Sequence, residues 1–334
     1  MKEKILKALR GSRGFISGQQ LCEMLGVSRT AVWKHIRQLQ SEGYEIEAVT
    51  NRGYRLVGSP DILASREVES YLTSQWIGRP ILYFSSTDST NLAAKRLGED
   101  GEKEGALVIA DEQTAGRGRS GRRWETPAGA NIAMTLLLRP KIAADRISMI
   151  TLVMGMAVAQ AVRSLYDLPA MIKWPNDIVI GSRKLCGILT EMSAELTGSG
   201  SAQPKVNYIV IGTGINANQR EFPEELREKA TSLIMELRHP VDRAKLIAQV
   251  MQLFEEYYSL FAGTQDMTPL RDSYNAMLVN TGREIRVLEP GKEYEGTAEG
   301  INDRGELMIR LPDGQLRAVY AGEVSVRGIY GEYV

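Results

Sequence analysis

The 334-residue sequence contains only two cysteines and two histidines, so the side chains that most often bind transition metals are scarce. Cys22 and Cys186 lie far apart, each among apolar residues, and we interpret both as small buried side chains in a reducing compartment. With only His35 and His239 besides, no usual zinc-ligand spacing can be assembled. We therefore expect no disulfide and assign no residue as a metal ligand.

Long apolar runs are also missing. No stretch approaches the ~18 apolar residues that a transmembrane helix needs, and the first residues, Met1-Lys-Glu-Lys-Ile-Leu, lack the apolar segment of a signal peptide. The formal net charge is zero, which gives no overall attraction to nucleic acid or membrane. We expect a cytoplasmic protein of two or three domains without a membrane partner.

Positive charge is nevertheless concentrated at the amino-terminal end, where residues 1–60 hold ten Lys and Arg against five Glu. A short helix from Gly18 to a glycine at position 26 and a second helix over 29–40 predict a helix-turn-helix. Ser28 is the expected N-cap of the second helix, and one apolar face would be buried. The exposed face carries groups suited to bases and phosphates. The candidate DNA-binding residues are Ser28, Arg29, Thr30, Trp33, Lys34 and Arg37.

A hairpin is predicted to follow these helices. Residues 44–49 and 53–57 alternate around an Asn/Gly turn, which completes a winged helix-turn-helix. Helix-turn-helix geometry alone does not establish DNA binding, and a small helical interaction domain is the alternative. The excess of positive charge and the hairpin favour DNA.

The most unusual stretch is Gly116-Arg-Gly-Arg-Ser-Gly-Arg-Arg-Trp124, with three glycines, four arginines and no acidic residue. It joins two apolar runs, 106–110 and 132–138, that predict buried strands. Arginine matches phosphate geometry, and glycine lets backbone N–H groups approach an anion. We therefore interpret this stretch, called the arginine loop below, as an anion-binding loop. Its GxGxxG spacing also occurs in dinucleotide sites, but Trp124-Glu-Thr-Pro127 stands where that motif requires a helix. A solvated Arg/Gly loop stays open as an alternative.

Three more polar clusters occur at the ends of predicted strands. Residues 85–91 could cap a helix or bind a polar ligand group. Lys173-Trp-Pro-Asn-Asp177 and the nearby Lys184 could form a cross-strand ion pair or bind an anion together. Residues 212–216 bring the backbone close to another group, or form a plain tight turn.

The remaining pattern predicts helices and a carboxyl-terminal β-domain. Helices are expected from Asp61 to about Trp76 and over 145–167, 221–237 and 241–261. From Asn280 on, short strands separated by turn residues predict a small SH3-like β-barrel. The expected strands are 284–288, 293–301, 306–310 and 315–320.

Five motifs, taken in order, closely resemble those of the biotin–protein ligases. With the winged domain, the chain resembles the bifunctional ligases that also repress the biotin operon. The resemblance implies an α+β chain with a winged helix-turn-helix domain (1–60), a mixed-sheet α/β catalytic domain (61–279) and an SH3-like domain (280–334). The motifs are Thr87–Asn91, Gln113–Trp124, Lys173–Asp177, Lys184–Gly187 and Gly212–Asn216.

The resemblance implies a two-step reaction that uses ATP and Mg²⁺. Biotin is first activated to biotinyl-5′-AMP and then joined to a lysine of a biotin carboxyl carrier domain, as in acetyl-CoA carboxylase or pyruvate carboxylase. The implied catalytic residues are Lys184, Arg117 and Arg119. The implied biotin and biotinyl-AMP contacts are Ser89, Thr90, Asn91, Gln113, Gly116, Arg117, Gly118, Arg119, Lys184 and Gly187. Arg122, Trp124, Asn176, Asp177 and Asn216 are implied at the nucleotide and the loop, and Phe222 is the candidate for the residue that stacks on adenine.

The resemblance also implies a homodimer in the presence of biotinyl-AMP, with two winged domains on a palindromic operator. Two other readings compete with it. A ligand-sensing repressor without catalysis would not need Lys184 or Asp177 beside the arginine loop. A lipoate or octanoyl transferase would be expected to lack both the arginine loop and the DNA-binding domain.

Overall fold

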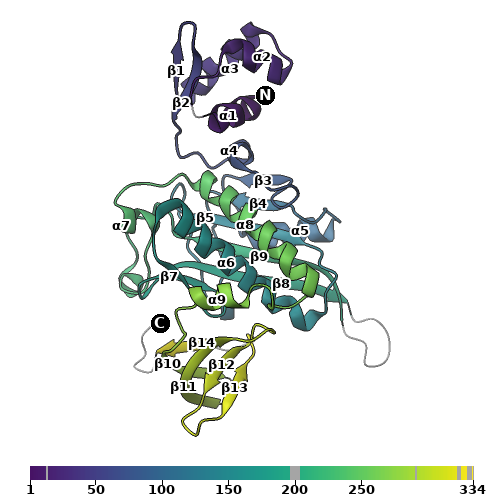
Figure 1. Ribbon diagram of the computed structural model, residues 1–334, viewed down its shortest axis with the longest axis vertical. Coiled ribbons are helices and arrows are strands. Elements are labelled where there is room, and N and C mark those ends of the chain that lie inside the picture. The colour runs from purple at the N-terminus through teal and green to yellow at the C-terminus, as the bar shows by residue number, and fades with distance from the viewer. Residues whose placement is uncertain (13, 196–203, 290–291, 322–324, 329–332, 334) are drawn as a thin grey trace. The chain divides into compact units, whose positions relative to one another are not determined.

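The structure is a computed structural model that describes residues 1–12, 14–195, 204–289, 292–321, 325–328 and 333 (Figure 1). Contacts divide the chain into two compact units. The first comprises residues 1–73 and 242–249, and the second comprises residues 74–241 and 250–334.

The first unit contains the predicted winged helix-turn-helix. The turn between its second and third helices depends on Gly26, whose φ of +66° is unfavourable for other residues. The Ser28 side chain accepts a hydrogen bond from the Ala31 amide, which confirms the predicted N-cap. Val32, Ile36 and Leu39 are buried in the core of this unit. The elements are α1 (Lys2–Gly11), α2 (Gly18–Leu25), α3 (Arg29–Ser41), β1 (Glu45–Val49) and β2 (Gly53–Gly58).

The helix predicted from Asp61 to about Trp76 is wrong at both ends, because α4 covers only Ser65–Tyr71. Asp61 does not cap α4; its carboxylate forms an ion pair with Arg243 (2.9 Å between Oδ2 and Nε) and accepts the Arg243 backbone amide (3.3 Å). The Arg243 side chain is only 2% exposed, so its charge requires this partner. The partner of Asp61 is therefore Arg243, a residue distant in the sequence, and not the helix that directly follows Asp61.

A seven-stranded mixed sheet forms the centre of the second unit. Its strand order is β3-β4-β5-β9-β8-β7-β6, and every pair is antiparallel except β3–β4. The mixed sheet confirms the predicted fold class. The strands are β3 (Ile81–Phe84), β4 (Leu107–Ala110), β5 (Ile132–Leu138), β6 (Ala170–Lys173), β7 (Asp177–Ile180), β8 (Arg183–Glu195) and β9 (Lys205–Ile215).

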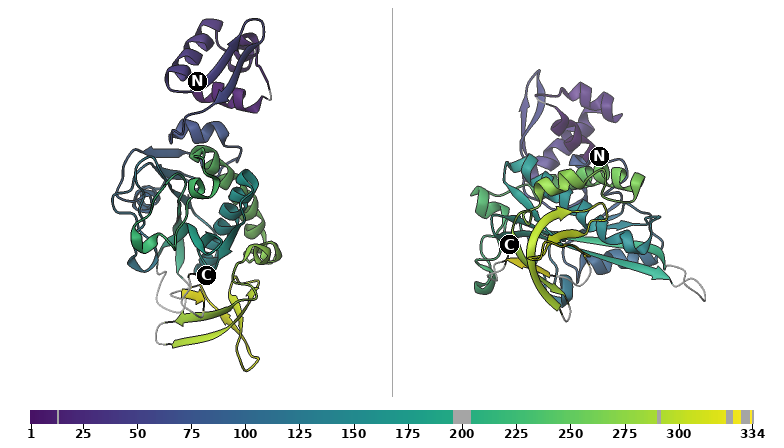
Figure 2. Two further views of the ribbon diagram at one scale, coloured as in Figure 1. Left: turned by 90° about the vertical axis from the view of Figure 1, so that its left-hand side faces the viewer. Right: turned by 60° about the horizontal axis from the view of Figure 1, so that its bottom comes forward.

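Helices cover both faces of this sheet (Figures 1 and 2). α5 (Thr90–Glu99) packs on β4, β5 and β9, and α6 (Ile147–Tyr166) packs on β6 to β8. Side chains alternate along β8: Thr190 bonds Thr151 of α6, whereas Glu191 bonds Asn91 of α5. The two helices therefore lie on opposite faces, and α5 marks the face that carries the site.

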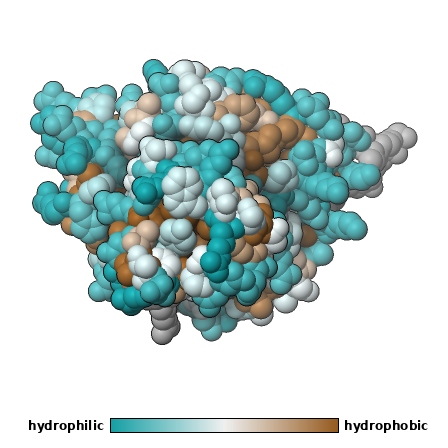
Figure 3. Space-filling model, turned by 90° about the horizontal axis from the view of Figure 1, so that it is seen from above, coloured by the Kyte–Doolittle hydropathy of each residue, from teal (hydrophilic) through white to brown (hydrophobic). Residues whose placement is uncertain are grey.

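The sequence around α6 is apolar because it lies in the core. Residues 144–166 form one helix in the described part of the chain that is long and apolar enough to cross a membrane, yet 78% of its most apolar window is buried. Hydrophilic residues cover most of the face shown in Figure 3, and hydrophobic residues are confined to smaller areas between them.

Two more sequence predictions are corrected between β9 and α8 (Arg243–Thr264). Residues 221–237 form only a 3₁₀ turn, Glu224–Leu226, and the short helix α7 (Leu233–Leu237). The chain between them pairs instead with β8, where the Lys184 amide donates to the Lys229 carbonyl (2.8 Å). The tight turn given as an alternative for residues 212–216 is also wrong, because β9 continues to Ile215.

After α9 (Arg271–Met277), the chain forms the predicted antiparallel β-domain. Its strand order is β13-β12-β11-β10-β14, and β14 was not predicted. The domain is joined to the central sheet through Trp174, whose indole N–H donates to the Gly305 carbonyl (3.1 Å). The strands are β10 (Glu284–Glu289), β11 (Lys292–Ile301), β12 (Leu307–Arg310), β13 (Leu316–Val319) and β14 (Ser325–Gly328).

Candidate functional site

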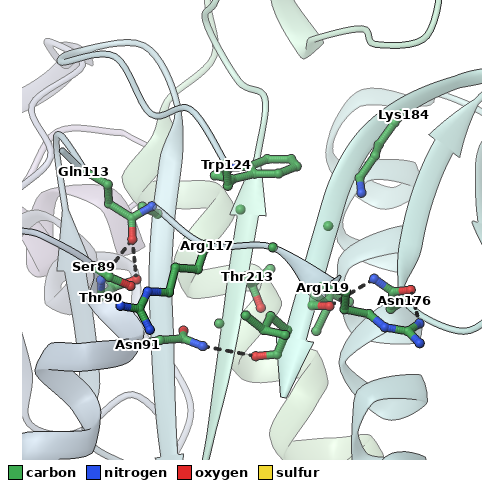
Figure 4. A pocket seen from close by; sticks show the side chains of 17 residues that line it. Ser89, Thr90, Asn91, Gln113, Arg117, Arg119, Trp124, Asn176, Lys184 and Thr213 are labelled. Atoms are coloured by element: carbon green, nitrogen blue, oxygen red, sulfur yellow. Dashed lines mark hydrogen bonds between the residues drawn. The ribbon is translucent and has the colours of Figure 1, made fainter. Parts of the chain in front are cut away.

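A narrow cavity opens on the α5 face of the sheet, between α5, the arginine loop, β8 and β9 (Figure 4). It gathers residues from all five sequence motifs, although these motifs lie far apart in the chain. Its lining includes Ser89, Thr90, Asn91, Gln113, Arg117, Gly118, Arg119, Trp124, Asn176, Lys184, Gly187 and Thr213.

A buried polar network forms the floor of this cavity. Thr135 donates to the side-chain oxygen of Asn91 (2.8 Å), and the Asn91 amide donates to Glu191 (2.8 Å). Burial raises the pKa of Glu191, but hydrogen bonds from Lys95 and Asn91 outweigh it and hold the pKa below its ordinary value. Asn91 is therefore fixed in one orientation. Thr135 and Glu191 were missed because both lie outside the five motifs.

The predicted capping role of the hydroxyl cluster takes a different form. Ser89 is the N-cap of α5 but makes no side-chain cap bond in the described structure. Gln113 supplies the acceptor instead, and its Oε1 receives both the Thr90 amide (2.9 Å) and the Thr90 hydroxyl (3.1 Å). Gln113 thus accepts a free backbone N–H at the start of α5, and this contact joins the motif Gln113–Trp124 to the motif Thr87–Asn91.

Three glycines on β8 and β9 keep the cavity open. A Cβ at Gly212 would lie 2.0 Å from the Asn91 Oδ1, and one at Gly214 would lie 2.3 Å from the Trp124 Nε1. At Gly187 a Cβ would be 3.0 Å from the Lys184 Nζ. The backbone approach predicted for residues 212–216 is therefore real, although the backbone there is a strand.

The arginine loop is a small antiparallel hairpin. The Trp124 amide donates to the Gly116 carbonyl (3.0 Å), and the Gly118 amide donates to the Arg122 carbonyl (2.7 Å). A Cβ at Gly116 would lie 2.3 Å from the Trp124 carbonyl oxygen, so only glycine fits there. Arg119–Gly121 forms a 3₁₀ turn at the tip.

The loop arginines reach in two directions (Figure 4). Arg117 extends towards the side of the cavity that carries Ser89, Thr90 and Asn91. Arg119 lies on the other side, where its guanidinium donates to the Asn176 side-chain oxygen (2.8 Å). Burial lowers the pKa of Arg119, and the nearby Asp177 charge opposes this change. A partly desolvated guanidinium gains from any anion placed beside it.

A wider cavity of about 570 Å³ adjoins the narrow one and shares Gly118, Arg119, Trp124, Asn176 and Lys184 with it. This volume is within the range of small-molecule sites. Cationic side chains, among them Arg122, Lys173, Lys184 and Arg327, outnumber the two carboxylates of its lining, Glu125 and Asp177. The cavity is therefore suited to a ligand with several negative charges.

Lys184 stands where the two cavities meet and forms an ion pair with Asp177 (2.6 Å between Nζ and Oδ1). Burial raises the pKa of Asp177, but Lys184 and Lys173 outweigh it and keep the pKa below its ordinary value. Lys173 is only 4% exposed, and burial lowers its pKa to about 7. The cross-strand ion pair, one of the two alternatives, is thus present at Lys184, whose side chain also lines both cavities.

Two polar atoms in the narrow cavity have unused hydrogen-bonding capacity. The Trp124 Nε1 and the Thr213 Oγ1 are buried and have no hydrogen-bond partner among the described residues. Such groups are costly in a folded protein unless a ligand or water satisfies them. Their position in the lining points to a ligand with polar atoms at both places.

The other predicted residues are placed as follows. The Asn216 amide donates to the Thr231 carbonyl (3.0 Å), so it holds the segment after β9, and Phe222 lines the wider cavity. In the first unit, Trp33 on α3 is 54% exposed, and Arg37 lies 5.6 Å from the centroid of its ring.

No group of three His, Cys, Asp or Glu suited to a metal ion occurs among the described residues.

Comparison with known proteins agrees with this site. Residues 2–55 match the HTH domain, residues 83–216 the Biotin/lipoate A/B protein ligase family, and residues 281–327 the Biotin protein ligase C terminal domain. The fold and the paired cavities therefore define a protein ligase of the biotin/lipoate class. Among its relatives, the bifunctional ligase/repressor BirA of Bacillus subtilis (strain 168) is 38% identical over 314 residues, which cover 93% of this chain and 94% of the relative. The chain belongs to the family of bifunctional biotin ligase/repressor proteins.

Two further relatives support the assignment. The bifunctional ligase/repressor BirA of Escherichia coli (strain K12) is 32% identical over 323 residues and covers 96% of both chains. The solved structure of the biotin protein ligase from Aquifex aeolicus in complex with biotin and ATP is 28% identical, with a TM-score of 0.63, and covers 75% of this chain and 99% of that one.

Proposed function

We propose that this protein activates biotin with ATP, transfers it to a lysine of carboxylase carrier domains, and represses transcription through its winged domain. One observation carries the proposal: a narrow polar cavity and a wide cationic cavity meet at Lys184. This arrangement suits a reaction that joins a small polar carboxylate to a nucleotide.

In the first step, an oxygen of the biotin carboxylate attacks the α-phosphorus of ATP. The new C–O–P bond forms as the bond to the leaving pyrophosphate breaks. Negative charge gathers on the phosphoryl oxygens, and Lys184, Arg117 and Arg119 are placed to stabilise it electrostatically. Asn91, Gln113 and the Trp124 indole N–H would hold biotin in the narrow cavity.

In the second step, the neutral amine of the acceptor lysine attacks the acyl carbon of biotinyl-AMP. The C–N bond forms, the bond to AMP breaks, and the amine loses a proton. A mixed anhydride would be hydrolysed in free solution, so the arginine loop must keep water away from it. The loop hairpin, held to the sheet through Arg119 and Asn176, is suited to this role.

The wider cavity would take the nucleotide. Arg122 and Lys173 provide positive charge for the phosphates, and Asn176 and Asp177 line the same cavity. Mg²⁺ would arrive with ATP, since this ion is commonly held by substrate phosphates and one or two carboxylates. Two carboxylates, Glu125 and Asp177, line this cavity, and Asp177 is already engaged in an ion pair with Lys184.

The test is pyrophosphate exchange into ATP. We expect exchange that depends on biotin, because only biotin should fill the narrow cavity and satisfy Trp124 and Thr213. Lipoate serves as the control substrate and separates this proposal from a lipoate transferase. Exchange that is absent with biotin, or equal with lipoate, contradicts the proposal.

The repressor activity rests on the first unit. Trp33, Lys34 and Arg37 lie on the same helix, whose Ser28 cap is intact. We propose that biotinyl-AMP orders the arginine loop, that two chains then dimerise, and that the two α3 helices read a palindromic operator in the cytoplasm. Half-sites would be spaced by whole turns of about 34–36 Å.

Footprinting on the operator region of biotin genes checks this switch. We expect protection at low protein concentration with biotinyl-AMP and at least tenfold weaker binding without it, because dimerisation is linked to ligand. Replacing both Lys34 and Arg37 by alanine should abolish protection while exchange activity is retained. Equal affinity with and without the ligand would remove the switch from the proposal.

A further inference from the structure

Tyr333 follows the five-stranded sheet along the chain and lies in the wider cavity. Its hydroxyl donates a hydrogen bond to the Oδ2 of Asp177. Its ring lies 3.6 Å from the Lys173 Nζ, measured to the ring centroid, and also packs on Val179 and Val279. The phenol is therefore held by packing, by a cation and by one hydrogen bond.

The two oxygens of Asp177 have different partners. Oδ1 pairs with the Lys184 Nζ at 2.6 Å, and Oδ2 accepts the Tyr333 hydroxyl. The Asp177 side chain is only 13% exposed, so little water can replace either partner. Removing a partner from a carboxylate that is this buried costs free energy, because its charge is then left uncompensated.

This pairing creates a conflict with the reaction. Lys184 must turn its ammonium group towards the biotin carboxylate and the α-phosphate, and doing so weakens its ion pair with Asp177. Without other partners, the uncompensated charge of Asp177 would keep Lys184 in the ion pair and away from the substrates. Tyr333 and Lys173 keep Asp177 satisfied while Lys184 is shared with the substrates.

We propose that Tyr333 is a positioning residue for adenylate formation: its hydroxyl holds Asp177 and so releases Lys184 to the reacting groups. This inference rests on the proposed function, since it assigns Lys184 to the first step. Tyr333, which follows the strands of the β-domain along the chain, thereby contributes its side chain to the nucleotide cavity. Tyr333 itself need not touch the substrates.

The test compares two substitutions with a control in the full chain. Tyr333→Phe removes only the hydroxyl and keeps the ring on Lys173. We expect about a tenfold lower kcat for biotin-dependent pyrophosphate exchange, with the KM for biotin unchanged, because biotin sits in the other cavity. Tyr333→Leu also removes the ring and should raise the KM for ATP. The control, Tyr294→Phe, changes a tyrosine of β11 whose ring contacts Arg317 at 4.3 Å, and should match the wild type.

A double-mutant cycle separates positioning from structural support. In a chain that carries Asp177→Asn, Tyr333→Phe should cause no further loss of kcat, because its hydroxyl no longer has a charge to hold. A transfer assay with added biotinyl-AMP should be unaffected by Tyr333→Phe. The inference is overturned if Tyr333→Phe keeps the wild-type kcat or if its effect is equal in both backgrounds. Wild-type protein without exchange activity would instead overturn the proposed function, and this inference with it.

Discussion

Replacing Lys184 by glutamine is expected to lower kcat for biotin-dependent pyrophosphate exchange by about 10²–10³-fold, the usual effect of removing one preorganised donor from a transition state. The Lys184 Nζ is within reach of both cavities and lies 5.4 Å from the centroid of the Trp124 ring. Glutamine keeps a similar length but cannot neutralise charge on the phosphoryl oxygens. Exchange kinetics at saturating biotin and ATP give the measurement.

The neighbouring Arg183 provides the matched control. Its guanidinium pairs with Glu236 (2.7 Å) and is absent from the lining of both cavities, so Arg183→Gln should change kcat by less than about threefold. Asp177 retains Lys173 and Tyr333 as partners in the Lys184→Gln protein, which should therefore fold. A Lys184→Gln protein with near-normal kcat would remove Lys184 from the chemistry.

Replacing Arg119 by glycine is expected to accelerate the release of biotinyl-AMP by about 100-fold, which corresponds to about 2.7 kcal/mol. The substitution removes the hydrogen bond to Asn176 that ties the loop to the sheet, together with a largely desolvated cation beside the adenylate. The measurement is the dissociation rate of labelled biotinyl-AMP. Biotin should also appear on lysines of an unrelated protein added to the reaction.

Arg123→Gly is the control for this loop. It introduces the same residue four positions later, at an arginine that lines only the wider cavity, is exposed and donates a weak bond to the Thr114 carbonyl (3.5 Å). We expect release within about threefold of the wild type. If biotinyl-AMP leaves the Arg119→Gly protein no faster than the wild type, the loop does not retain the intermediate.

Much of the fold could be predicted from local pattern. The helix-turn-helix depends on Gly26 and Ser28, whose conformational and capping preferences act within a few residues. β5 coincides with the predicted run 132–138 because a strand buried on both faces is continuously apolar. The predictions that failed, the long helix after Asp61 and the helix over 221–237, lie where distant side chains or strands compete for the same backbone or charge.

The candidate site shows the same division. Its arginines, Lys184 and the hydroxyl cluster stand in motifs that the sequence displays. Gln113 as the acceptor for α5, Thr135 and Glu191 beneath Asn91, and Tyr333 on Asp177 could not be predicted, because each contact joins residues between 23 and 156 positions apart. A local sequence pattern gives information only about contacts between residues that are close along the chain.

The sequence by itself determined which chemical groups are available: a cationic glycine loop, a lysine close to a carboxylate, and a basic helix-turn-helix. Only the tertiary structure decided that β8 and β9 bring these groups to one face of a sheet, that glycines there leave room for Asn91 and Trp124, and that Tyr333, far away in the sequence, satisfies Asp177. The reason is physical. Residue type sets charge and hydrogen-bonding capacity, whereas burial and distance, which decide how strongly those capacities act, exist only after the chain has folded.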